Sequence, residues 1–584
     1  FYPRGRPMSN SLPPDALVAP MDFEETGRGL GCIRDVAEGE DLVVIPLDTC
    51  FWAGGSRQAP ELQPLVEGGV ELTDLDVCAL HLLIERAKGS ASSHWAHLQD
   101  LPVGYDSTLF WSASELDGLS GSDWKELAER FSQEAKSDWE ALQALLACSV
   151  SETAAAATFL AQHGIDWDGY LWAYATLKSR QAEANVDGSM ARLMAPGFDL
   201  FNHSDGLTPG SSHYFDSERR ALVCRASHAH AKGEQAFISY GTASNGSLLL
   251  GGGFVLGANR FDFVEVVLTS ECDEPRLPLY LMSAPDVPPI DELAQFEFAD
   301  MPQDEDVADG KTIPFTTKHR LTLSSPLPSS LVTRVRLDRM SDEELDAQKR
   351  RASKNGKELW EAARADAPLD PLHELATLGA LRSVLQGKLS GYPSSLDADR
   401  AALEALQQTN DAPAQGSLTD ATATEEAAAA ARRKLLSLLL VSSEKQILAA
   451  ALAACDARLP PMLQELLRSS AAQEAACRAA RKTWSTVLQQ RSSVLRQQAA
   501  RVTWFFERVH SCSLGPGETT AAFHAQACTA FMLLLSGLGA HPRAALTTYA
   551  PAASPFTPPP PAAAAAAAST AAAATARAAQ QLDA

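Results

Sequence analysis

Residues 199–204 read DLFNHS, residues 238–245 read ISYGTASN and residues 25–31 read ETGRGLG, and these three stretches decide the fold. Each is polar or rich in glycine at a place where a core strand or helix would be apolar. The three glycines of ETGRGLG allow the backbone to approach a ligand closely. GRGLG does not match the GxGxxG pattern and no βαβ unit follows it, which excludes a dinucleotide-binding fold.

Polar residues in these stretches have two interpretations when each is considered alone. Asn202 and His203 could bind a polar ligand or brace a buried turn, and bracing is favoured. Asp199 and His203 are four residues apart and could hold a metal ion, but two ligands make an incomplete site. Tyr240 ends an apolar run, so its phenol could face a cleft or lie at the surface.

Two segments with similar patterns predict β-hairpins in the first half. Residues 29–46 place apolar runs on either side of AEGE, and residues 220–240 do the same around AKGE. We expect one small sheet to use both hairpins, with residues 261–268 as a further strand.

Helices are predicted between these two segments. Residues 73–88 begin with a capping pattern and are apolar almost all round, which is typical of a buried helix. Residues 123–147 and 167–181 predict two more. His81 and Glu85 have a spacing that suits metal ligands, but no third ligand is evident, so a polar pair within a buried helix is favoured.

The second half predicts an all-helical region. Residues 285–310 are rich in proline and acids, which is typical of a linker. Helical spacing follows at residues 371–389, 396–407, 425–454 and 463–510. The sequence from residue 554 is of low complexity, and disorder is expected there.

Composition narrows the class of protein. The 584 residues carry a net charge of -24, which disfavours a nucleic-acid binder because phosphate neutralisation needs clustered lysine and arginine. No run of about 18 strongly apolar residues appears, which argues against a membrane span. The ten cysteines form no CxxC pair, so we expect reduced, intracellular thiols and no zinc. The compartment is left open.

Taken in order, the motifs resemble a known family. ETGRGLG, TLKSRQ, MAPGFDLFNHS, GEQAFISYGTASN and GGGFVLGANRFDFV are similar to the SET domain of the Rubisco large-subunit lysine methyltransferase and actin-histidine methyltransferase group. FTTKHRLTLSSPLPSSLVTRVRLDRMS and HELATLGALRSVLQGKLSGYPSSLDADRAAL resemble the helical substrate-binding domain of that group. The resemblance covers residues 15–455.

The resemblance implies an α+β fold in several parts. Residues 1–270 would form the SET domain, with a helical insert at about residues 60–175. Residues 271–455 would form the substrate-binding domain. An additional helical region of unknown role would follow at residues 456–550, and a low-complexity tail at residues 551–584.

The resemblance also implies roles for particular residues. Tyr240 matches the catalytic tyrosine, and Arg180 matches an arginine near the carboxylate of S-adenosylmethionine. The other residues that match cofactor-binding positions are Thr26, Gly27, Arg28, Asp199, Asn202, His203 and Phe254. The acceptor pocket would include Ala182, Tyr240 and Gly252.

The implied activity is therefore methyl transfer from S-adenosylmethionine to a protein. A lysine acceptor is favoured because it is commoner among relatives, and a histidine acceptor is the alternative because Gly252 stands where lysine-methylating members have tyrosine. A SET-fold scaffold without catalysis is a third interpretation. The implied partner is a protein substrate held by the helical domain, with no metal, nucleic acid or membrane, and the chain is expected to be monomeric.

Overall fold

The structure is a computed structural model that describes residues 11–24, 26–148, 155–272, 313–340, 342–354, 371–410 and 421–468. The predicted linker, the predicted helical region beyond residue 468 and the predicted tail lie outside these residues.

Small sheets make up the β part of the first half. One sheet has the strand order β1-β2-β9-β6, a second has the order β3-β8-β7, and β4 pairs with β5. The strands are β1 (Val18–Phe23), β2 (Gly27–Cys32), β3 (Asp41–Pro46), β4 (Ala182–Val186), β5 (Ser189–Leu193), β6 (Asn202–His203), β7 (His213–Asp216), β8 (Ala221–Arg225) and β9 (Gln235–Ile238).

The predicted hairpins are wrong in their pairing, although their strands exist. β2 does not pair with β3, and β8 does not pair with β9. Instead β2 pairs with β9 and β3 pairs with β8. The connections between the strands also run side by side, because Val36 and His230 exchange backbone hydrogen bonds of 2.9 Å. The two segments therefore pair with each other along their length and pass together from one sheet to the next.

A group of helices separates the strands of the first half. Thr73 caps the buried helix α3, since its side chain accepts the Asp76 N–H, and the predicted cap is confirmed. The helices are α1 (Ala53–Ser56), α2 (Gln63–Glu67), α3 (Asp74–Lys88), α4 (Trp95–Leu98), α5 (Ala113–Leu116), α6 (Asp123–Cys148), α7 (Ala155–His163), α8 (Trp167–Arg180) and α9 (Asn245–Gly252). Short 3-10 turns are η1 (Leu47–Thr49), η2 (Gly89–Ala91), η3 (Thr108–Phe110), η4 (Asp117–Leu119) and η5 (Phe198–Leu200).

The second half is a two-stranded ribbon followed by helices. Its elements are β10 (Val264–Cys272), β11 (Ile313–Leu321), α11 (Ser329–Arg339), α12 (Asp342–Lys354), α14 (Pro371–Ser390), α15 (Leu396–Asn410) and α16 (Ala421–Arg468). The predicted strand at residues 261–268 overlaps β10, which pairs with β11 and not with the sheets of the first half. Val264 and Val266 are buried with residues of the later helices.

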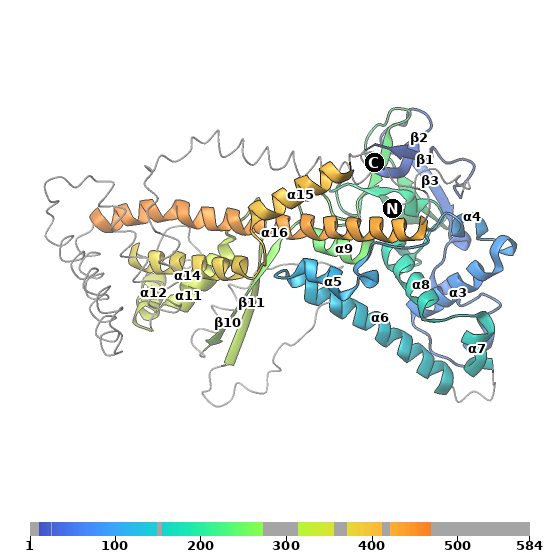
Figure 1. The fold of residues 1–584 in the computed structure, drawn as a ribbon, viewed down its shortest axis with the longest axis horizontal. Helices are drawn as coiled ribbons and strands as arrows, with labels where there is room; N and C mark the ends of the chain where they lie inside the picture. Colours follow the sequence, from blue (N-terminus) through green and yellow to red (C-terminus); the bar gives the residue numbers. More distant parts are fainter. Residues whose placement is uncertain are drawn as a thin grey trace.

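The long helix α16 joins the two halves. Leu435 and Leu440 lie in the core of the helical insert, whereas Ile447 and Cys455 lie in the core of the second half. Figure 1 shows α16 running from α11, α12 and α14 to the end of the molecule that holds β1–β3. By length and composition Glu426–Arg458 could cross a membrane, but 67% of its most apolar window is buried, as in the core helix of a soluble protein.

Candidate functional site

The parallel pair β6 and β9 brings two of the three deciding stretches together. Asn202 lies opposite Phe237, and His203 lies opposite Ile238. Tyr240 follows the end of β9 by two residues, so the sheet places its side chain beside the Asn202–His203 segment.

Tyr240 is held from several sides. Its hydroxyl donates a hydrogen bond of 2.6 Å to the Phe201 carbonyl, and its backbone N–H donates one of 3.0 Å to His203 Nδ1. Its ring stacks on the His203 imidazole with the centroids 5.0 Å apart, and the Phe254 ring meets it edge-on at 6.3 Å. Burial raises the pKa of Tyr240 to about 12, so the phenol is neutral at neutral pH.

His203 offers a donor at its other ring nitrogen. Burial lowers the pKa of His203, and because Nδ1 accepts a hydrogen bond, the neutral ring carries its proton on Nε2. Among the described residues that buried Nε2 has no hydrogen-bond partner. A buried donor without a partner indicates a place for a ligand or water.

The glycine-rich stretch lies against the same segment. Asn202 Nδ2 donates a hydrogen bond of 3.0 Å to the Arg28 carbonyl, and Thr26 Oγ1 donates one of 2.6 Å to Gln235 Oε1. A side chain at Gly29 would overlap the Gln235 and Asn202 amides. The Gln235 Nε2 donor is buried and has no partner within the described part of the chain.

Two further residues of this stretch, Gly27 and Arg28, were predicted to bind the cofactor. The structure shows a backbone conformation for the first and an ionic contact for the second. Gly27 has a φ of 68°, a left-handed conformation that glycine adopts most readily. The Arg28 side chain is 8% exposed, and its Nε lies 3.7 Å from Asp22 Oδ1. Glu25, which precedes these residues, is outside the described residues.

Arg180 and Asp199 form a buried ion pair next to this site. Arg180 Nη1 donates hydrogen bonds of 3.0 Å to both the Asp199 carbonyl and Asp199 Oδ2. His97 Nε2 lies 3.3 Å from Asp199 Oδ1, and the Asp199 side chain is only 1% exposed. Burial alone would raise the pKa of Asp199, but His97 and Arg180 hold it below its usual value.

Known proteins match this chain in two ways. Residues 301–448 match the family described as Rubisco LSMT substrate-binding. The actin-histidine N-methyltransferases of Homo sapiens and Mus musculus are each 30% identical to it over 272 residues, 45% of this chain and 43% of each relative. The match thus spans less than half the length of these relatives.

Solved structures give the fold. The SET domain of LSMT bound to lysine and AdoHcy is 20% identical with a TM-score of 0.53, covering 78% of this chain and 90% of that one. Rubisco LSMT bound to sinefungin and monomethyllysine is 19% identical with a TM-score of 0.52 and the same coverage. The chain has the LSMT fold. The predicted α+β class and the predicted resemblance are therefore confirmed.

Within this LSMT fold, the two small residues predicted for the acceptor pocket have different surroundings. Ala182 begins β4 and is 5% exposed, in the same apolar core against which Tyr240 packs. Gly252 ends α9, and a Cβ there would lie 2.6 Å from Phe254 Cε1. Gly252 therefore allows the Phe254 ring to lie directly on the backbone.

The sequence did not predict two residues that lie at the site. It did place two pairs of residues, Asp199 with His203 and His81 with Glu85, at spacings that suit metal ligands. His97 belongs to α4, outside the motifs that predicted site residues, and no sequence signal points to its contact with Asp199. Gln235 is part of the quoted GEQAFISY motif, but only the strand pairing brings it to Thr26. Asp199 pairs with Arg180 and His97, whereas His203 accepts the Tyr240 backbone N–H. Glu85, from the second pair, accepts hydrogen bonds from Lys88 and Ser92.

Proposed function

We propose that this chain is an S-adenosylmethionine-dependent protein methyltransferase that modifies a lysine side chain. The observation that supports this most strongly is Tyr240, whose hydroxyl is held on the Phe201 carbonyl beside Asn202 and His203. The LSMT fold and the relatives named as methyltransferases support the same conclusion.

The buried polar groups near Gly29 offer hydrogen-bonding capacity for a polar ligand, which in this proposal is S-adenosylmethionine. Buried donors at His203 Nε2 and Gln235 Nε2 have no hydrogen-bond partner within the described residues, and the absence of a side chain at Gly29 lets the Gln235 and Asn202 amides lie close to the backbone there. When bound, the cofactor would supply a methyl group on a sulfonium. The residues that would hold it are Thr26, Gly27, Arg28, Arg180, Asn202, His203 and Phe254.

Asp199 is a positioning residue in this proposal. Its carboxylate is buried against Arg180 and His97, so it would fix the Arg180 guanidinium at the cofactor site. Arg180, oriented in this way, would meet the carboxylate of the amino acid portion as a charge-assisted hydrogen-bond donor.

Tyr240 would orient the acceptor nitrogen. A neutral phenol has one proton, and Tyr240 donates it to the Phe201 carbonyl, so the remaining lone pairs can accept an N–H from the acceptor. That contact would point the nitrogen lone pair at the methyl group, which an in-line displacement requires. The acceptor's surplus proton would leave to solvent.

The choice of acceptor depends on the same pocket. A lysine has a pKa of about 10.4 in water and must lose its proton in the apolar channel, whereas a histidine near 6.5 is already mostly neutral. A histidine acceptor is the second candidate, because the relatives that match in sequence are named actin-histidine N-methyltransferases and because Gly252 provides no second pocket tyrosine. Peptides with lysine or histidine at the modified position would separate the two.

The second half would bind the protein substrate. The match of residues 301–448 to the Rubisco LSMT substrate-binding family supports this role. The acidic net charge of -24 favours a protein partner over a nucleic acid. We propose that the chain acts as a monomer.

Cofactor binding tests the proposal independently of the substrate. S-adenosylmethionine or its demethylated product should raise the melting temperature by mass action, and Asn202→Ala should weaken the effect. An unchanged melting temperature at millimolar cofactor, in a sample shown to be folded, would mean that the assignment is wrong. Binding without methylation of any protein in a lysate given labelled cofactor would support the scaffold interpretation.

A further inference from the structure

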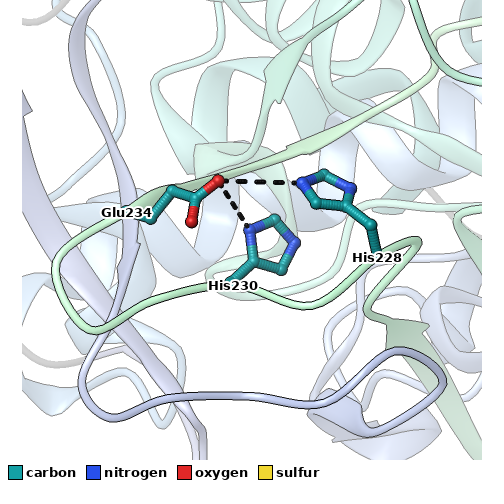
Figure 2. Close-up of side chains that lie close together, drawn as sticks. All are labelled: His228, His230 and Glu234. Carbon is teal, nitrogen blue, oxygen red and sulfur yellow. Dashed lines mark ion pairs between the residues drawn. The ribbon is translucent and has the colours of Figure 1, made fainter.

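Two histidines and a glutamate converge in the connection from β8 to β9. Glu234 Oε1 lies 3.7 Å from His228 Nε2 and 3.6 Å from His230 Nδ1. One ligand atom from each residue lies within 4.8 Å of the other two. Figure 2 shows the two imidazoles on one side of the carboxylate, each turned toward it.

The backbone holds these side chains in place. Glu234 Oε2 accepts the Ala231 N–H at 2.9 Å, which leaves Oε1 for the histidines. His230 exchanges two backbone hydrogen bonds with Val36 in the neighbouring segment. Ser227 Oγ lies 3.0 Å from His228 Nδ1, so the hydroxyl can accept from that nitrogen and leave Nε2 as a lone pair.

His230 provides an independent sign of a ligand. Its side chain is 2% exposed, and its buried Nδ1 has no hydrogen-bond partner within the described part of the chain. This buried nitrogen without a partner indicates a place for a ligand.

We propose that His228, His230 and Glu234 bind one Zn²⁺ ion, with a water at the fourth position. A tetrahedral ion with bonds of about 2.1 Å holds its ligands about 3.4 Å apart, close to the two observed separations from Glu234 Oε1. Imidazole ligands favour zinc over calcium or magnesium, which prefer oxygen. His228 and Glu234 are 53% and 46% exposed, so an ion can enter from solvent.

The ion would act on stability and not on methyl transfer. Glu234 precedes β9 and Tyr240 follows it, so the metal site lies at the other end of that strand from Tyr240. Zinc would join the connection at residues 226–234 to the strand that supplies Gln235. The expected effect is a higher melting temperature with the transfer chemistry unchanged.

Zinc content and melting temperature, measured on the full chain with ZnCl₂ alone, test the site. After equilibration and dialysis, we expect the wild type to retain about one zinc ion more per chain than His228→Ala or Glu234→Gln. Zinc should raise the melting temperature of the wild type and not of these variants. His228 and Glu234 are partly exposed, so both variants should fold, and circular dichroism will verify this.

Matched controls remove similar groups elsewhere. Glu218→Gln changes an exposed carboxylate in the β7–β8 turn, at the other end of β8, and His163→Gln changes a histidine in α7. Both should retain the full zinc content and the full thermal shift. All variants keep the ten cysteines, so zinc held by thiols is the same in every sample. Equal zinc content in the wild type and His228→Ala would overturn the proposal.

Discussion

Two buried acids, Asp199 beside the proposed active site and Glu444 in α16, have opposite electrostatic environments. Asp199 is paired with Arg180 and His97, and these neighbours hold its pKa below the usual value against the effect of burial. Glu444 accepts hydrogen bonds from Ser122 Oγ at 2.9 Å and the Tyr392 hydroxyl at 3.0 Å. Burial raises the pKa of Glu444 to about 8, so it is mostly protonated at neutral pH.

The difference between the two sites lies in their cations. Lys445 follows Glu444 in sequence, but its ammonium is paired with Asp399, and both of those side chains are 1% exposed. Within the described part of the chain, the groups that act on the pKa of Glu444 are the Ser122 and Tyr392 hydroxyls and two carboxylates, Asp262 and Asp123. At the proposed active site the ionised Asp199 carboxylate fixes the Arg180 guanidinium. At the junction between the halves the neutral Glu444 carboxyl links α16 to Ser122 and Tyr392.

The largest expected effect comes from replacing Asp199 with its uncharged isostere. Asp199→Asn leaves the Arg180 guanidinium buried without its counter-charge, which typically costs about 3 to 5 kcal/mol. We expect urea unfolding at pH 7 to show a loss of this size, together with weaker binding of S-adenosylmethionine. A loss below about 1 kcal/mol would mean that Asp199 is not the anchor of Arg180.

The matched change at Glu444 should act in the opposite direction. Glu444 binds its proton more tightly in the folded state, so the free energy of unfolding should fall as pH rises from about 4.5 to about 8. Glu444→Gln stays neutral and should be about 1 to 3 kcal/mol more stable than the wild type at pH 9, since each unit of pKa shift corresponds to about 1.4 kcal/mol and relaxation recovers part of it.

Urea unfolding of both proteins between pH 5 and pH 9 measures this effect. Near pH 5 the two should be similar, and the gap should open with rising pH. Parallel pH profiles would show that Glu444 is ionised throughout and that the contrast with Asp199 does not exist.

A smaller effect is expected from the hydroxyl of Thr26. Thr26→Val removes the hydrogen bond of 2.6 Å to Gln235 Oε1, which is worth about 1 kcal/mol. Cofactor affinity, measured by calorimetry, should fall about fivefold because Gln235 loses its orientation. Thr49→Val is the control, since it removes a bond to the Pro46 carbonyl away from the site. Equal losses of cofactor affinity in Thr26→Val and Thr49→Val would show that Gln235 does not contribute to cofactor binding.

Local sequence patterns predicted the elements but not their partners. The cap at Thr73 and the start of α3 depend on neighbouring residues, so they could be read directly. The strands around residues 29–46 and 220–240 were also visible, yet alternation of apolar residues does not specify whether β2 pairs with β3 or with β9. That choice depends on the turns at residues 33–40 and 226–234, which carry both segments between sheets.

The same limit applies to the buried acids and to the histidine cluster. Asp199 contacts His97, and Glu444 contacts Ser122, because the fold brings together residues that are far apart in the sequence. Residue spacing therefore does not predict either contact. The pattern SHAHAKGE at residues 227–234 does place two histidines and a glutamate within seven residues. Its meaning depends on the turn that folds Glu234 back on the histidines, and that turn is a feature of the structure.

The most direct measurement compares methyl transfer with cofactor binding in Tyr240→Phe. The change removes one hydroxyl and keeps the ring that stacks on His203, so the melting-temperature shift with cofactor should persist. Single-turnover transfer of labelled methyl to the protein substrate should fall about 100-fold, because the acceptor nitrogen loses its orientation. Tyr214→Phe, whose hydroxyl lies near Arg225, should transfer normally. Transfer by Tyr240→Phe at the wild-type rate would contradict the central claim that this hydroxyl aligns the acceptor.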